Sequence, residues 1–167
     1  MVTMDPARIL RHLTTTTWSV RRAFPRAAMQ AIERAIRATE ATHEGQLRFA
    51  VEHALNLPHL WAGVSARERA IDVFSHLRVW DTQYNNGVLI YLLLADRDVE
   101  IVAARGIHLH VGEGWEPICR RMEERFRRGE FEAGVIEGIG AVGEHLERHF
   151  PRSTRGPNEL PDAPVVL

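Results

Sequence analysis

The chain has 167 residues, 45% of them hydrophobic, and a formal net charge of −1 at pH 7, which is the size and composition of one globular domain. The near-zero charge argues against a nucleic-acid partner, because such binding depends on many contacts between basic residues and phosphates. No apolar run approaches the ~18 residues of a transmembrane segment, and the first residues do not resemble a signal peptide. Because Cys119 is the only cysteine, no internal disulfide is expected, and we predict a cytoplasmic protein.

The first half of the chain predicts helices followed by a strand. Asp5 and the proline after it form a helix-start signal, so a helix is expected to about residue 12, before a β-branched stretch at 14–17. Apolar residues at helical spacing predict a second helix that ends near residue 41. Alternation over 46–55 predicts a half-buried strand with Glu52 on its polar face, and residues 56–63 read as a loop. Ser65 and Glu68 form a capping box that starts the next helix.

The second half predicts a hairpin and two further helices. Residues 87–95 are continuously apolar, as in a central strand covered on both faces, and a turn at Asp96 joins them to a partner strand at 99–103. Alternation around His108 and His110 suggests a short extended segment. Two helices follow, separated by Gly129, and we expect Gly134, Gly138 and Gly140 of the second one to let it pack closely against the sheet or a neighbouring helix. Residues 151–167 are rich in proline and predict a disordered tail. The fold class is therefore α/β: a small mixed β-sheet with an antiparallel hairpin, flanked by helices on both faces.

An ordered set of motifs covers residues 86–150: a turn ending in glycine, an apolar strand, an Asp-Arg pair, a second strand, a glycine, and a helix. The residues that carry it are Asn86, Gly87, Asp96, Arg97, Gly106, Phe126, Gly129, Glu130, Phe131 and Gly134. In this order they resemble the TPM domain family, which groups thylakoid-lumen proteins of photosystem II repair, a nematode receptor auxiliary protein and many bacterial proteins. The resemblance implies a TPM-type sandwich over residues 20–150, with an N-terminal helix and extension at 1–19 and a tail at 151–167.

The resemblance also implies a function. Members of the family have been linked to calcium binding and to weak acid-phosphatase activity. The chain is therefore expected to be an accessory or binding module that acts with a membrane-associated protein partner, with calcium as its cofactor; the alternative is a weak metal-assisted acid phosphatase. One departure from the family pattern is that Arg105, Gly106 and Ile107 stand where members have a glycine-aromatic-glycine turn. No nucleophile elbow or P-loop occurs in the sequence, which favours the binding module.

Two groups of polar residues are candidate sites. Asn85, Asn86 and Arg105 are predicted to share one rim of the sheet, because the second hairpin strand returns to the level at which the first begins. Asp81 lies on the same rim as a candidate metal ligand, and if the strand at 46–55 also ends there, Glu52 joins them as a ligand-binding residue. The alternative is that Asp81 caps a turn and Arg105 is solvated.

The hairpin turn supplies further candidate metal ligands. Asp96 and Asp98 carry oxygen ligands suited to calcium, although aspartates are also common in polar turns that bind no ion. His108 and His110 have a spacing compatible with zinc or copper, or they lie on an ordinary exposed edge. A basic face on the helix before Gly129 is either solvated or a docking surface for an acidic partner or membrane surface.

Overall fold

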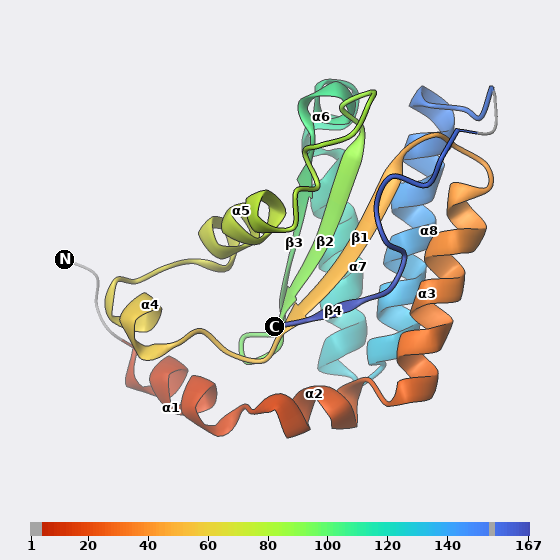
Figure 1. The fold of residues 1–167 in the computed structure, drawn as a ribbon. Helices are drawn as coiled ribbons and strands as arrows, with labels where there is room; N and C mark the ends of the chain where they lie inside the picture. The colour runs from red at the N-terminus through yellow and green to blue at the C-terminus, as the bar shows by residue number, and fades with distance from the viewer. Residues whose placement is uncertain (1–4, 154–155) are drawn as a thin grey trace.

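A computed structural model describes residues 5–153 and 156–167. At its centre is a mixed four-stranded sheet of order β3-β2-β1-β4 (Figure 1). Strand β1 pairs in parallel with β2 and with β4, whereas β2 and β3 form an antiparallel hairpin. The strands are β1 (Gln46–Glu52), β2 (Gly87–Leu93), β3 (Asp98–Ala103) and β4 (Val165–Val166). This arrangement confirms the predicted mixed sheet and hairpin.

Helices cover both faces of the sheet and both of its ends (Figure 1). One face packs against α3 (Arg26–Glu40), α7 (Trp115–Arg127) and α8 (Phe131–His149). The other face packs against α4 (Leu57–Trp61) and α5 (Ala66–His76). Helices α1 (Pro6–Thr14) and α2 (Thr17–Ala23) run along one end, and α6 (Arg105–Val111), with the 3₁₀ turn Gly112–Gly114, lies at the other. None of the helices within the described ranges is long and apolar enough to cross a membrane.

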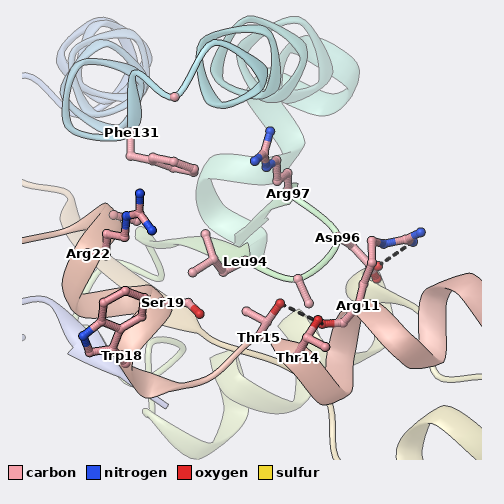
Figure 2. Close-up of a pocket in the computed structure, with 13 residues that line it drawn as sticks. Arg11, Thr14, Thr15, Trp18, Ser19, Arg22, Leu94, Asp96, Arg97 and Phe131 are labelled. Carbon is pink, nitrogen blue, oxygen red and sulfur yellow. Dashed lines mark hydrogen bonds and ion pairs between the residues drawn. The ribbon is translucent and has the colours of Figure 1, made fainter.

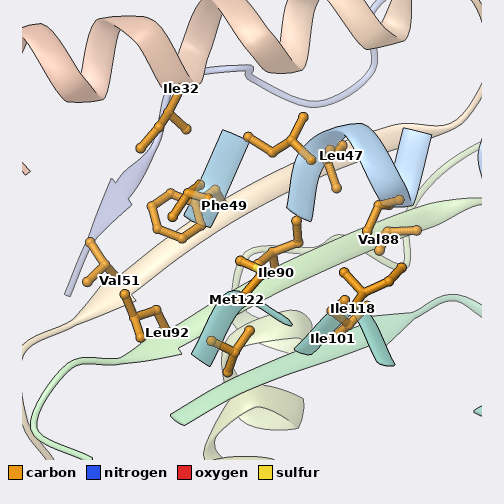
Figure 3. Close-up of a cluster of buried hydrophobic side chains, with 14 of the residues drawn as sticks. Ile32, Leu47, Phe49, Val51, Val88, Ile90, Leu92, Ile101, Ile118 and Met122 are labelled. Atoms are coloured by element: carbon orange, nitrogen blue, oxygen red, sulfur yellow. The ribbon is translucent and has the colours of Figure 1, made fainter. Parts of the chain in front are cut away.

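Strand β2 contributes side chains to the hydrophobic cores on both faces of the sheet. All seven of its residues are buried, and alternate side chains point to opposite faces. Val88, Ile90 and Leu92 lie in the cluster shared with α3, α7 and α8 (Figure 3), whereas Leu89 and Tyr91 lie in the cluster shared with α5. Burying such side chains stabilises the fold by about 1.5–3 kcal/mol each, which explains the unbroken apolar run in the sequence.

Strand β1 was predicted to be half-buried, but all seven of its residues are buried. The C-terminal segment is the reason, because it crosses the polar face of β1. Arg48 Nη1 donates to the carbonyl of Pro161 at 2.9 Å, and Gln46 Oε1 accepts from the backbone N–H groups of Glu159 and Leu160, each at 2.9 Å. The prediction of a disordered tail at 151–167 is therefore wrong for its described residues. Residues 154–155 of that segment, and residues 1–4 of the expected N-terminal extension, lie outside the described ranges.

The glycines of α8 let this helix pack closely against two neighbours. A Cβ at Gly138 would collide with Met122 of α7, and one at Gly143 would collide with Thr39 of α3. The close packing expected at Gly138 is thus confirmed, as it is at Gly134, where a Cβ would collide with Phe126 of α7; the close contact at Gly143 was not predicted. The expectation is wrong for Gly140, where a Cβ would meet no atom within 4 Å.

Three short helices were not predicted, and one of them, α6, replaces the extended segment expected around His108 and His110. Helix α4 replaces the loop expected at 56–63, because Asn56 caps it by accepting the N–H of His59 at 3.0 Å. Helix α2 begins inside the β-branched stretch, where Ser19 Oγ accepts the N–H of Thr16 at 3.1 Å. Helices α4 and α2 are thus each stabilised by a side-chain hydrogen bond at the N-terminus, and α2 leads into α3.

Candidate functional site

The strand register separates the residues that were expected to share one rim. In the parallel β1–β2 pair, Gln46 lies opposite Gly87 and Glu52 lies opposite Leu93. Glu52 is therefore at the carboxyl end of the sheet, whereas Asn85 and Asn86 enter β2 at the amino end. At about 3.3 Å per residue, the length of the strand separates them by about 20 Å. The hypothesis of one rim that includes Glu52 is wrong.

Glu52 has a structural environment of its own. The guanidinium of Arg69 donates to both of its carboxylate oxygens, at 2.9 and 3.0 Å, and the Tyr91 hydroxyl donates to Oε2 at 2.5 Å. Burial, together with the hydrogen bond to Glu52, raises the pKa of Tyr91 well above its usual value. All three groups are therefore engaged in a buried link between β1, β2 and α5, which leaves Glu52 poorly placed to bind a ligand.

The other rim residues do come together at the amino end of β2. The backbone N–H of Ala104 donates to the carbonyl of Gly87 at 2.8 Å, and Gly106 lies against the carbonyl of Asn85, where any Cβ would collide. The predicted proximity of the loop entering β2 and the segment leaving β3 is thus confirmed. Arg105, at the start of α6, is exposed beside this loop.

Two of these rim residues hold the loop in place. Asn86 is fully buried and donates through Nδ2 to the Glu44 carbonyl at 3.0 Å. Asp81 forms an exposed ion pair with Arg78 at 2.6 Å. These contacts favour loop stabilisation, and a ligand-binding role for Asn85, Asn86 and Arg105 stays a prediction.

The Asp96 carboxylate lies in the β2–β3 turn and is surrounded by cations from α1. Arg8 Nε is 2.9 Å away, Arg11 Nη2 3.2 Å and His12 Nε2 3.1 Å. Because His12 Nδ1 accepts the N–H of Leu55 at 2.9 Å, its Nε2 carries the proton that faces Asp96. Burial opposes ionisation of Asp96, but hydrogen bonds from Arg8 and His12 outweigh it and hold its pKa below the usual value.

Asp98 does not complete a cation site with Asp96. Burial, followed by the nearby charges of Glu100 and Glu123, raises the pKa of Asp98 to about 6. In the described part of the chain, no three or more His, Cys, Asp or Glu side chains are grouped so that they could share a metal ion. Calcium requires six to eight oxygen ligands, and the oxygens of Asp96 are already occupied by arginines and histidine. The residues present therefore do not fit the calcium site that the resemblance implies.

His108 and His110 lie on α6, not on an extended segment. The His110 ring stacks on His149 of α8, with 4.8 Å between centroids and 13° between planes. The His-x-His spacing therefore does not act as a strand-borne pair, because residues two apart on a helix point in different directions.

A concave surface lies at the carboxyl end of β2, in a cleft of about 890 Å³ (Figure 2). We call it the arginine cleft. It lies between α1, α2, the β2–β3 turn and the start of α8. Polar and apolar side chains share its lining: Arg11, Thr14, Thr15, Trp18, Ser19, Arg22, Leu94, Asp96, Arg97 and Phe131.

Two arginines of the cleft are held by aromatic rings. The Arg22 guanidinium carbon is 5.6 Å from the centroid of Trp18, and that of Arg97 is 5.9 Å from the centroid of Phe131. Among the described residues, neither arginine forms an ion pair. Trp18 is 64% exposed. The cleft therefore combines two cations that are available to an anion with an accessible aromatic surface.

The sequence did not predict this cleft, because no helix was expected at the residues that form α2. The available signal was the position of Arg97 next to Asp96 in the hairpin turn, together with the glycine at the α7–α8 junction. Gly129 has a positive φ of 76°, which turns the chain so that Phe131 of α8 reaches the turn. Arg97 also has a positive φ, of 50°, which is uncommon for a residue other than glycine.

The architecture defines a class of protein: a three-layer α/β sandwich whose hairpin turn, between β2 and β3, presents an Asp-Arg pair at one end of the sheet. The TPM domain family model matches residues 21–145, and the chain belongs to this family.

Solved structures of other proteins are similar to the chain. The BA42 protein from the psychrophilic bacterium Bizionia argentinensis is 29% identical, with a TM-score of 0.74 over 84% of this chain and 93% of that one. The N-terminal domain of a P. gingivalis protein is 21% identical, with a TM-score of 0.60 over 77% of this chain and 82% of that one, and this second likeness concerns the fold alone. No curated protein matches the sequence significantly.

Proposed function

We propose that this TPM-domain protein is a binding module that holds an acidic segment of a protein partner in the arginine cleft. The observation that carries the proposal is that the negative charge of the cleft is already paired, whereas two of its positive charges are not, among the residues that the structure describes. The one carboxylate of the cleft, Asp96, is neutralised by residues of α1, whereas Arg22 and Arg97 lie over aromatic rings without an ion pair in the described part of the chain. The cleft is therefore complementary to a negative charge.

The size and lining of the cleft favour a peptide over a small inorganic ion. Its volume of about 890 Å³ is in the range of sites that enclose drug-sized molecules. The exposed ring of Trp18 offers surface to non-polar side chains beside the charges. The Ser19 hydroxyl accepts the N–H of Thr16, so its own proton is available to a carboxylate.

A metal-assisted phosphatase receives less support from the same groups. Phosphate-ester hydrolysis of that type needs carboxylates or histidines that are free to hold the ion. Glu52 and Asp96 are instead bound by arginines. An arginine cleft can still bind a phosphate ester, and the test below therefore includes hydrolysis as a measured outcome.

Calorimetric titration with an acidic peptide tests the proposal. A blocked octapeptide of alternating glutamate and leucine is expected to bind, and its glutamine counterpart is expected to bind at least about tenfold more weakly, because charged hydrogen bonds contribute about 1.5–3 kcal/mol each. The double variant R22Q/R97Q should lose the same factor. Arg34→Gln, an exposed arginine on α3 outside the cleft, is the matched control.

Three results would contradict the proposal. One is equal binding of the two peptides, and another is equal loss in the control variant. The third is turnover of p-nitrophenyl phosphate that R22Q/R97Q abolishes and Arg34→Gln preserves, which would favour the phosphatase instead.

A further inference from the structure

Strand β3 lies at the edge of the sheet, with β2 on one side and no strand on the other within the described residues. The N–H of Ala104 donates to Gly87 in the β2–β3 ladder. Since neighbouring residues of a strand alternate in direction, the backbone groups of Val99 and Ile101 face away from β2. Such an unpaired edge is a template for another extended chain.

Side chains from the two helical layers cover this edge in place of a strand. Arg67, at the start of α5, donates through Nη1 to the carbonyl of Ile101 at 2.7 Å. Glu123 of α7 accepts the N–H of Val99 at 3.2 Å. The Arg67 side chain is 47% exposed, so solvent or a peptide can replace it at modest cost. The edge groups are thus satisfied by side chains, and Val99 and Ile101 are only 2% and 3% exposed, so an added strand reaches their main chain once the Arg67 and Glu123 side chains move aside.

A groove of about 310 Å³ follows this edge between α5 and α7. Acidic residues dominate its lining, with Asp98, Glu100, Glu113, Glu116 and Glu123 against the two arginines Arg67 and Arg120. Trp115 also lines the groove, and its buried indole Nε1 has no hydrogen-bond partner within the described ranges. The groove therefore presents negative charge beside the edge of β3.

We propose that a basic, extended segment of a partner protein binds in this groove as an added strand on the free edge of β3. Its main chain replaces the Arg67 and Glu123 side chains at Ile101 and Val99, and its basic side chains face the acidic lining. Strand addition derives affinity from main-chain hydrogen bonds and specificity from side chains. The groove shares no residue with the arginine cleft, so this proposal stands or falls separately from the first.

Nuclear magnetic resonance titration of the ¹⁵N-labelled protein tests the proposal with a blocked hexapeptide of alternating arginine and valine. We expect saturable shifts at the amides of Val99 and Ile101. The same peptide methylated on alternate backbone nitrogens keeps its charge but loses its strand donors, and it should bind at least about tenfold more weakly. A glutamate–valine peptide should not bind. Equal binding of the methylated peptide, shifts confined to other regions, or no shift at millimolar peptide would each overturn the proposal.

A pair of variants separates strand addition from simple charge attraction. Arg67→Ala and Arg120→Ala each remove one positive charge from the groove lining, but only Arg67 covers the Ile101 carbonyl; Arg120 pairs with Glu116 at 3.5 Å. Arg67→Ala is expected to tighten binding of the arginine–valine peptide several-fold more than Arg120→Ala. Equal effects in two variants with native spectra would contradict the strand model.

Discussion

Replacing Asp96 with asparagine tests how the N-terminal helix α1 is held against the sheet. In the native protein, Asp96 contacts Arg8, Arg11 and His12, and its side chain is 13% exposed. Arg11 is 50% exposed, so its pair contributes little. Arg8 and the fully buried His12 side chain make hydrogen bonds to a charged group, each contributing about 1.5–3 kcal/mol. Since asparagine keeps one acceptor, we expect a loss of about 2–4 kcal/mol.

Hydrogen exchange at the Leu55 amide measures this loss locally, because that amide donates to His12 Nδ1. A loss of 2–4 kcal/mol corresponds to exchange that is roughly 30- to 1000-fold faster in Asp96→Asn, at about 1.4 kcal/mol per factor of ten. Asp81→Asn is the matched control, because Asp81 forms only an exposed pair with Arg78. Equal exchange of Leu55 in both variants would refute the assigned role of Asp96.

The pH dependence gives a second check. The pKa of Asp96 is lower in the folded protein than in the unfolded chain. Its ionised form therefore stabilises the fold above the unfolded pKa of about 3.9, and this contribution disappears as the pH falls through the folded pKa. The difference in unfolding free energy between wild type and Asp96→Asn should be constant near neutral pH and should shrink below about pH 4. A difference that stays unchanged down to pH 2 would contradict the electrostatic explanation.

The remaining predictions concern α8 and the end of α3. Gly143→Ala should destabilise the protein by about 1–3 kcal/mol, because the added Cβ collides with Thr39. Gly140→Ala should instead stabilise it by up to about 1 kcal/mol, because a Cβ there meets open space. Urea unfolding measures both changes, and equal effects of the two variants would contradict the packing of α8. Burial raises the pKa of Glu40 to about 8, above that of the unfolded chain, so its ionisation destabilises the fold as the pH rises from about 4.5 to 8. Glu40→Gln should therefore gain stability relative to wild type across that range, and a difference independent of pH would refute this.

The chain belongs to the TPM family, but its described residues do not fit the calcium site that the resemblance implied. Family membership follows from the match over residues 21–145, but the aspartates of the hairpin turn are arranged for structural ion pairing. Helix α1, which provides Arg8 and Arg11, lies before the matched region. The cations that neutralise Asp96 therefore come from a part of the chain that the family model does not include.

Local patterns in the sequence were sufficient to determine most of the elements. The capping box at Ser65 and the apolar spacing along α3, α7 and α8 specify helices, because these signals depend on backbone groups and side chains within a few residues. The run at 87–95 is typical of a central strand, since a strand covered on both faces buries every side chain. The TPM family also followed from the order of short motifs.

Only the tertiary structure decided which ends of these elements meet. A strand's alternation is the same whether its neighbour is parallel or antiparallel, so the pattern around Glu52 did not reveal that β1 runs parallel to β2 and ends far from Asn85. The helix between the two strands was the available clue, because a crossover helix joins parallel strands. The arginine cleft and the free edge of β3 depend on contacts between residues distant in the sequence, such as Arg97 with Phe131 and Arg67 with Ile101, and these contacts form only when the layers pack.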